Sequence, residues 1–269
     1  MKDFLGVNFS KLTILESVSF CLKKIISDFP EKLFFFQIKK KIKEAKEHLS
    51  FEKNSHNQLK NLLNLFYFIW RFKEINGKYN LSDVLLLDKV LQTYRGTALS
   101  LGIILLHFAN KLNISLDPVI FPTQIILKSN LSNKKTLLIN PFNGEILNNR
   151  VLDLWLKGNI SSTIDLNESY LKVAKSKDVL KKFFNVLKSS LMEEKKIELA
   201  LNVSNVLLKI FPKDPYEVRD RGLIYSQLGC YEVAIEDLSY FIYKCPDDPI
   251  IDILKLKIQS IKNNICTLH

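Results

Sequence analysis

The sequence predicts an α+β fold: a helical N-terminal part that carries a small antiparallel sheet, followed by an all-α region. Three observations lead to this prediction. Apolar residues recur at the helical period of about 3.6 through most of the first 113 residues. Between residues 114 and 139 this period gives way to short extended segments. From residue 177 onward the pattern is helical again, and it repeats.

Four helices are expected before residue 92. Their expected bounds are Phe9 or Ser10 to Asp28, Lys32 to Leu49, Leu59 to Phe72, and Ser82 to Leu91. Pro30 ends the first helix, because proline lacks the amide hydrogen that a helix interior needs. Asn76-Gly77 turns the chain after the third helix, and Ser82 is the expected N-cap of the fourth.

The most apolar helix is expected from Arg95 to Asn113, directly before the sheet. An extended stretch is expected next, over residues 114–121, with a turn at Asp117-Pro118. Two strands follow over residues 124–128 and 136–139, joined by a polar turn over residues 129–135, and a tight loop over residues 140–144 comes after them. A short buried helix is then formed by Val151, Leu152, Leu154, Trp155 and Leu156, and it stops at Gly158-Asn159. Helices followed by a small antiparallel sheet are typical of the α+β class.

Composition and charge narrow the functional classes. The hydrophobic fraction of 47% and the charged fraction of 25% are ordinary for a soluble globular protein. No apolar run approaches the roughly 20 residues of a membrane span, and no signal peptide is recognised, so no membrane partner and a cytoplasmic location are expected. The four cysteines are scattered and are expected to be free thiols.

The net charge of +11 comes from lysine, since only five of the 39 basic residues are arginine. Recognition of bases and phosphates favours the planar guanidinium group of arginine. We therefore expect a solvated lysine-rich surface rather than a nucleic-acid site.

The C-terminal region carries a 34-residue repeat. Ala200 and Ala234 lie 34 residues apart, and the phrase Phe211-Pro-Lys-Asp-Pro215 is echoed by Cys245-Pro-Asp-Asp-Pro249. This period is that of tetratricopeptide repeats, in which paired helices stack into an array. Two repeats (181–214 and 215–248) and a capping helix over residues 250–262 are expected. Gly222 and Ala234 let the paired helices approach, whereas Lys188 stands where the first repeat should have a small residue.

Four motifs then resemble a bacterial family. They are Arg95-Gly-Thr-Ala-Leu-Ser-Leu101, Asn140-Pro-Phe-Asn-Gly-Glu145, Trp155-Leu-Lys-Gly-Asn159 and Asp220-Arg-Gly-Leu-Ile-Tyr-Ser-Gln-Leu228. Together they resemble the SirB-type (YchA-like) family, in which a transglutaminase-like core precedes tetratricopeptide repeats. The resemblance covers nearly the whole chain and implies a transglutaminase-like domain over residues 1–170 and a repeat domain over residues 176–264.

Active members of the wider transglutaminase and papain-like class use a Cys-His-Asp triad. The resemblance places the cysteine position at Ala98, the histidine position at Gln124 and the aspartate position at Asn140. Alanine cannot attack a carbonyl carbon, glutamine exchanges no proton near pH 7, and asparagine cannot support an imidazolium. The resemblance therefore implies a degenerate core without a catalytic residue, and neither a metal nor a cofactor is expected.

Two other residues on the central helix are candidate substitutes for the triad, and one residue beside the helix is a candidate ligand contact. Ser100 and His107 share a helix face, but seven residues at about 1.5 Å each separate them by about 10 Å. Arg95, at the mouth of the expected cleft, can bind a carboxylate or brace its loop through a backbone carbonyl or Asp88. The bracing role is favoured.

The candidate binding residues of the repeats lie on the first helix of the second repeat: Tyr216, Arg219, Tyr225 and Gln227. Packing against the neighbouring helix is the favoured role of Tyr225. The sequence therefore predicts a non-catalytic interaction protein that binds a protein or peptide through its repeats. The alternative is an atypical amide hydrolase or transferase whose nucleophile is a hydroxyl such as that of Thr97 or Ser100.

Overall fold

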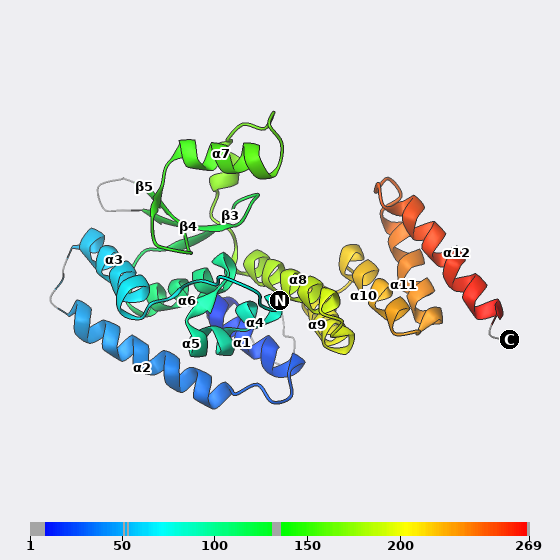
Figure 1. Cartoon of the computed structure of the whole chain (residues 1–269), viewed down its shortest axis with the longest axis horizontal. Coiled ribbons are helices and arrows are strands. Elements are labelled where there is room, and N and C mark those ends of the chain that lie inside the picture. The colour runs from blue at the N-terminus through cyan, green and yellow to red at the C-terminus, as the bar shows by residue number, and fades with distance from the viewer. Residues whose placement is uncertain (1–8, 51, 53, 131–135, 268–269) are drawn as a thin grey trace. The chain divides into compact units, whose positions relative to one another are not determined.

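The computed structural model describes residues 9–50, 52, 54–130 and 136–267 (Figure 1). The α-helices of these residues are α1 (Ile14–Ile25), α2 (Glu31–Leu49), α3 (Ser55–Asn64), α4 (Leu81–Leu85), α5 (Leu87–Thr93), α6 (Ala98–Lys111), α7 (Asn149–Asn159), α8 (Ser176–Glu193), α9 (Ile197–Ile210), α10 (Pro215–Gln227), α11 (Tyr231–Lys244) and α12 (Ile251–Thr267). Shorter helical segments are η2 (Phe9–Lys11), η3 (Leu65–Ile69) and η4 (Glu168–Leu171). The strands are β1 (Lys73–Glu74), β2 (Arg95–Gly96), β3 (Asp117–Ile120), β4 (Ile125–Asn130), β5 (Thr136–Ile139) and β6 (Ile146–Leu147).

The chain divides into two compact units. Among the described residues, one unit contains residues 9–23 and 28–183, and the other contains residues 24–27 and 184–267. The first unit combines helices with small sheets, whereas the second is all-helical. The predicted α+β class is therefore confirmed. The division falls inside α8, so this one helix contributes to both units.

The larger sheet is an antiparallel meander in the order β3-β4-β5-β6. Asp117 pairs with Lys128 and Pro118 with Leu127, so the turn expected at Asp117-Pro118 is wrong. Proline is tolerated in β3 because this strand lies at the edge of the sheet. Strand β5 has its predicted bounds, β4 continues through Asn130, and residues 131–135 of the expected turn lie outside the described residues.

Helices cover both faces of this sheet: α7 lies on one side and α6 on the other (Figure 1). Ile126 points into a core cluster that contains Leu152 and Leu156 of α7. Ile125 and Leu127 point the opposite way, and a methyl group on Gly102 of α6 would lie within 3.7 Å of both. Because both faces are buried there, the first three residues of β4 are all apolar instead of alternating with polar residues.

Helix α7 is longer than expected. It begins at Asn149, where the side chain of Asn148 accepts a hydrogen bond from the backbone N–H of Val151. It ends at Asn159, so the stop predicted at Gly158-Asn159 is confirmed. Leu154 was predicted to be buried but is 59% exposed. The buried stripe of α7 consists of Leu152 and Leu156, which lie four residues apart on one face.

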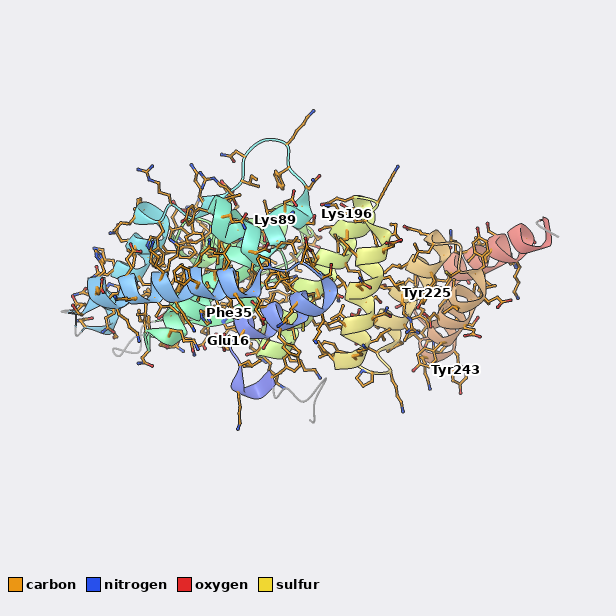
Figure 2. All side chains as sticks on the ribbon, turned by 90° about the horizontal axis from the view of Figure 1, so that it is seen from below. Glu16, Phe35, Lys89, Lys196, Tyr225 and Tyr243 are labelled. Carbon is orange, nitrogen blue, oxygen red and sulfur yellow. The ribbon has the colours of Figure 1, made fainter. Side chains whose placement is uncertain are left out.

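Three of the predicted N-terminal helices have different bounds. The helix expected from Phe9 or Ser10 to Asp28 is the short segment η2 followed by α1, which begins at Ile14 and ends at Ile25. The helix expected from residue 59 to residue 72 is α3 followed by the π-helical turn η3. The helix expected from Ser82 to Leu91 is two helices, α4 and α5, separated at Leu86 by an extended backbone angle. Asn80 occupies the N-cap position and Ser82 lies inside α4, so the predicted cap is wrong. A salt bridge between Lys89, labelled in Figure 2, and Asp83 joins the two helices.

The repeats form as the 34-residue period predicts, with α8–α9 and α10–α11 as helix pairs and α12 after them. Asp214 caps α10, and Pro215 is its first residue. A methyl group on Gly222 would lie 2.9 Å from Cβ of Asp237 and 3.2 Å from the carbonyl oxygen of Ala234. The predicted close approach of the paired helices is therefore confirmed.

Candidate functional site

The first turn of α6 is closed by hydrogen bonds between its own side chains and backbone. Thr97 Oγ1 accepts from the N–H of Ser100, and Ser100 Oγ accepts from the N–H of Thr97 at 2.9 Å. Ser100 Oγ also donates to the carbonyl oxygen of Val84 at 2.6 Å, and the residue is fully buried. Ala98, at the expected cysteine position, is 5% exposed and presents only a methyl group.

Arg95 braces the segment before α6. Its Nη1 donates to the carbonyl oxygens of Arg71 and Tyr94, each at 3.1 Å. Its backbone belongs to the short parallel pair of β1 and β2, where it lies opposite Lys73. The guanidinium group thus bonds to backbone carbonyl oxygens, as expected for the bracing role that the sequence favours.

Gln124 and Asn140 lie at strand ends close to α6. A methyl group on Gly102, one turn after Ala98, would lie 3.7 Å from Ile125 and 3.6 Å from Pro141, the neighbours of these two residues. The chain neighbours of Gln124 and Asn140 therefore lie against α6 one turn after Ala98.

Backbone geometry explains why Asn140 suits its position. Its Oδ1 accepts from the N–H of Phe142 at 3.1 Å, and its carbonyl oxygen accepts from the N–H of Gly144 at 2.8 Å. Gly144 has φ +77°, which few residues other than glycine adopt. The predicted tight loop is confirmed. The amide side chains of Gln124 and Asn140 can donate and accept hydrogen bonds, but they exchange no proton near pH 7.

Cys21 is the cysteine that belongs to the same unit as α6 among the described residues. Cys21 is buried in α1, and burial raises the pKa of its thiol to about 12, so it is protonated at neutral pH. Cys230 and Cys245 are free thiols of the repeat unit, and the side chain of Cys266 lies outside the described residues.

His107 lies toward the opposite end of α6 and makes its hydrogen bond to Thr13 instead of to Ser100. The ring is 3% exposed, and its Nδ1 lies 2.8 Å from the hydroxyl of Thr13 at the start of α1. Lys111 Nζ, one turn later, lies 2.8 Å from a carboxylate oxygen of Glu16. These four residues form a polar cluster that joins the start of α1 to the end of α6.

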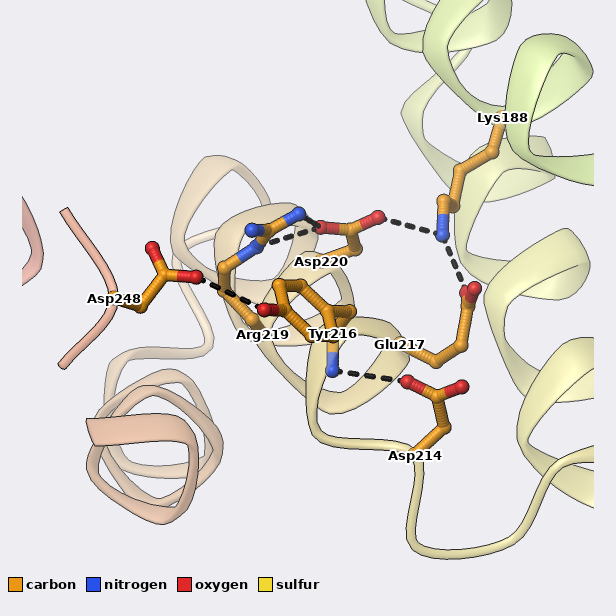
Figure 3. A network of polar contacts seen from close by, with 7 residues as sticks. All are labelled: Lys188, Asp214, Tyr216, Glu217, Arg219, Asp220 and Asp248. Carbon is orange, nitrogen blue, oxygen red and sulfur yellow. Dashed lines mark hydrogen bonds and ion pairs between the residues drawn. The ribbon is translucent and has the colours of Figure 1, made fainter. Parts of the chain in front are cut away.

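Two of the candidate residues of the repeat unit, Tyr216 and Arg219, belong to a polar network that includes several residues of α10 (Figure 3). Tyr216 donates from its hydroxyl to Asp248 at 3.0 Å, and Arg219 makes two hydrogen bonds to Asp220 at 3.0 and 2.7 Å. The guanidinium carbon of Arg219 lies 5.2 Å from the ring centre of Tyr216. Gln227 is exposed at the end of the helix.

The tyrosines differ in exposure. Tyr225 is half-buried and packs against the core cluster of α11 and α12, whereas Tyr243 of α11 is 78% exposed (Figure 2). Tyr225 thus has the packing role that the sequence favoured.

Lys188 completes the network from α8. Its Nζ lies 2.6 Å from Glu217 and 2.8 Å from Asp220, and Figure 3 shows it pointing between the two carboxylates. The side chains of Lys188 and Glu217 are 2% and 1% exposed. The sequence signal for this ion-pair cluster is a lysine at a position where the repeat should have a small residue. Two acidic residues that can pair with it follow on α10.

Family models match both units. A model described as the transglutaminase-like superfamily matches residues 34–185, more than half of the chain, and a tetratricopeptide repeat model matches residues 187–259. The chain belongs to the transglutaminase-like superfamily.

Several relatives of this transglutaminase-like chain match it from end to end. A UPF0162 protein of Buchnera aphidicola subsp. Baizongia pistaciae is 52% identical over all 269 residues, covering 100% of both chains. Protein SirB1 of Salmonella typhimurium and the UPF0162 protein YchA of Escherichia coli K12 are each 44% identical with the same coverage. The resemblance to the SirB-type (YchA-like) family is therefore confirmed. No solved structure matches the chain.

The described part of this transglutaminase-like chain shows two further negative findings. None of its helices is long and apolar enough to cross a membrane. Within the same residues, no three His, Cys, Asp or Glu side chains are grouped so that they could hold a metal ion.

The polar cluster around His107 was not anticipated from the sequence. Its signal was Thr13-Ile-Leu-Glu16, because Thr and Glu three residues apart form a capping box at a helix start. The structure shows both bonds of this box, Glu16 N–H to Thr13 Oγ1 at 3.2 Å and Thr13 N–H to Glu16 at 2.8 Å. The expected start of the first helix at residue 9 or 10 obscured this signal.

Proposed function

We propose that this chain is a non-catalytic interaction protein whose repeat unit binds a segment of another protein. The observation that carries the proposal is the side chain at the start of α6. Ala98 has no reactive group, and the neighbouring hydroxyls of Thr97 and Ser100 are engaged in the helix cap. Both partner positions carry amides, at Gln124 and Asn140.

The repeat unit supplies a suitable binding surface. Tyr216 is 45% exposed, Arg219 is partly exposed beside it, and both side chains are held by aspartates. Tyrosine and arginine are enriched among residues that dominate protein–protein binding energy. Because these side chains are already ordered by Asp248 and Asp220, little rotamer entropy is lost when a partner binds.

Photo-crosslinking from exposed Gln227 in the native cell tests the binding surface. We expect a discrete protein adduct with the full-length chain and a loss of about tenfold or more in adduct yield in the Tyr216→Ala variant, as for a residue that dominates binding. Tyr243→Ala removes an equally large but exposed tyrosine from the other helix, so it serves as the control and should leave the yield unchanged. Equal yields from all three proteins would contradict the proposal.

Active-site labelling tests the absence of catalysis. The full-length chain is treated with a fluorophosphonate, which labels activated hydroxyls, and with iodoacetamide, which labels thiols, and the modified residues are mapped by mass spectrometry. We expect iodoacetamide to modify Cys230 and the fluorophosphonate to modify nothing. A fluorophosphonate adduct at Thr97 or Ser100 would instead favour an atypical amide hydrolase or transferase.

The proposal places the chain in the cytoplasm and gives it a protein rather than a nucleic-acid partner. The free thiols of Cys21, Cys230 and Cys245 suit a reducing compartment. Cell fractionation tests the location. Binding to DNA that shows no sequence preference and declines steeply with salt would represent simple attraction between lysines and phosphates.

A further inference from the structure

A cavity of about 340 Å³ lies beside the polar cluster of His107, at the end of α6 away from Ala98. Its lining comes from η2 and the start of α1, the end of α6, the segment that leads into β3, and the start of α8. Ligand pockets in proteins have volumes of about 300–1,000 Å³, so a small molecule fits here.

His107 presents an unused ring nitrogen to this cavity. Burial lowers the pKa of its imidazole to about 4, so the ring is neutral near pH 7. Nδ1 of the ring is bonded to the hydroxyl of Thr13, which also accepts from the N–H of Glu16. Nε2 is left to donate or to accept one further hydrogen bond, as the tautomer of the neutral ring decides. Among the described residues, no hydrogen bond satisfies this second nitrogen.

The cavity also carries one positive and one negative side chain that do not pair with each other. Glu16 and Lys111 satisfy one another across the lining. Lys11 and Asp117 line the same cavity, and no salt bridge within the described part of the chain engages either of them. Separate, unneutralised charges of opposite sign favour a ligand that carries both signs itself.

We propose that this cavity binds a small zwitterion of the amino-acid type. Lys11 meets its carboxylate, Asp117 meets its ammonium group, and Nε2 of His107 supplies a further hydrogen bond to the ligand. The inference does not depend on the proposed function, because the cavity lies in the transglutaminase-like unit, whereas the proposed protein-binding surface lies on the repeats. It also does not use the degenerate positions at the other end of α6.

Calorimetric titration of the full-length chain at pH 7 tests this proposal. Each standard L-amino acid is titrated, together with the dipeptide alanyl-alanine. N-acetyl-L-alanine, which lacks the ammonium group, and L-alaninamide, which lacks the carboxylate, serve as comparators for L-alanine, and the same pair of derivatives is used for any better ligand. We expect one of the zwitterions to bind and both of its derivatives to bind about tenfold more weakly or worse, since each has lost a charge-assisted contact. Tighter binding of the dipeptide than of any amino acid assigns the site to short peptides.

Variants of the lining attribute the binding to this cavity. Asp117→Asn should remove the preference for the parent ligand over its N-acetyl derivative, and Lys11→Gln should remove the preference over its amide. Lys175→Gln and Asp178→Asn change exposed charges outside the lining and should bind as the unaltered chain does. Circular dichroism melts establish that all four variants fold.

Three results would overturn the proposal. One is the absence of heat with every zwitterion at about 10 mM, where even a millimolar dissociation constant gives binding. Another is equal affinity for a zwitterion and its two derivatives. The third is unchanged affinity in both Asp117→Asn and Lys11→Gln.

Discussion

At the scale of single residues, Lys188 shows how one buried charge joins two helices of the repeat unit. Its ammonium group leaves water almost completely, which by itself is costly, and two carboxylates of α10 offset that cost at 2.6 and 2.8 Å. Asp220 is shared with Arg219, so two cations and two anions balance one another. Removal of Lys188 or Glu217 leaves the other one buried without full compensation.

Lys188→Met should therefore destabilise the protein strongly. We expect the free energy of unfolding to fall by about 3–5 kcal/mol, because the carboxylate of Glu217 stays buried after losing this cation. Urea unfolding followed by circular dichroism measures the change. Lys182→Met, on the same helix but partly exposed, is the control and should cost less than about 1 kcal/mol.

The double variant Lys188→Met/Glu217→Gln separates charge from packing. It should regain a large part of the lost stability, because both charges are removed together. If the double variant is no more stable than Lys188→Met alone, the ion pair is not the cause.

His107 makes stability depend on pH. Its folded pKa of about 4 lies below its ordinary value of 6.5, so between these values the unfolded chain binds a proton that the folded chain does not. Its contribution to stability is thus complete above about pH 6.5 and is lost as the pH falls toward 4. The pKa difference corresponds to about 3 kcal/mol.

His107→Gln should flatten the pH dependence of the unfolding free energy between pH 6.5 and 4.5. Denaturant titrations at intervals of about half a pH unit measure the unfolding free energy at each pH. Proton linkage gives the slope that this one histidine should contribute. His48→Gln, which changes an exposed residue of α2, should retain the slope of the unaltered protein. Equal slopes in all three proteins would assign the acid sensitivity to other groups.

At the scale of elements, two glycines in helices have opposite roles. Gly222 allows α10 to touch α11, with 2.9 Å between an added methyl group and Cβ of Asp237. Gly158, in the last turn of α7, has nothing within 4 Å of that position. Helix propensity favours alanine over glycine by about 1 kcal/mol at both sites. The two sites therefore differ in the space around the added methyl group and not in propensity.

Gly222→Ala should destabilise the repeat unit by about 1–3 kcal/mol despite the better propensity, because the helices must separate. Gly158→Ala should be neutral or stabilising by up to about 1 kcal/mol. Thermal unfolding of the two variants beside the unaltered chain tests both expectations. A stable Gly222→Ala protein would mean that the α10–α11 contact adapts easily.

Local patterns predicted some elements and not others. Strand β5, the loop at Asn140 and the repeat helices follow from alternation, turn residues and a fixed period, which are properties of the sequence itself. The break at Leu86 and the π-turn at Leu65–Ile69 do not interrupt apolar periodicity, so nothing local indicates them. Phe66 of this turn stacks on Phe72 at 4.2 Å and meets Phe108 of α6, so tertiary aromatic packing accompanies the altered helix.

The candidate sites divide in the same way. A motif located Ala98, Gln124 and Asn140, but the hydrogen bond from Ser100 to Val84 depends on a segment 16 residues away. The cavity beside His107 needed contacts between residues 94 positions apart, which no local pattern contains.

At the scale of the whole molecule, the chain has two compact units that share the helix α8. Calorimetry should therefore resolve two unfolding transitions, because each unit has its own buried core. Gly222→Ala should lower only the transition of the repeats, and Ser100→Ala, which removes bonds of the α6 cap, only that of the other unit. A single transition shifted by both variants would show one cooperative unit instead.

The ion-pair cluster of Lys188 also constrains how this lineage can change over time. A neutral substitution at position 188 removes the cation that lies 2.6 Å from the buried carboxylate of Glu217, and a neutral substitution at 217 leaves the buried ammonium group of Lys188 with the more exposed carboxylate of Asp220. Each single change should therefore lower stability, so the two positions should change together. Homologues that carry alanine or glycine at 188, as an ordinary repeat would, should therefore lack the acidic residue at 217 as well.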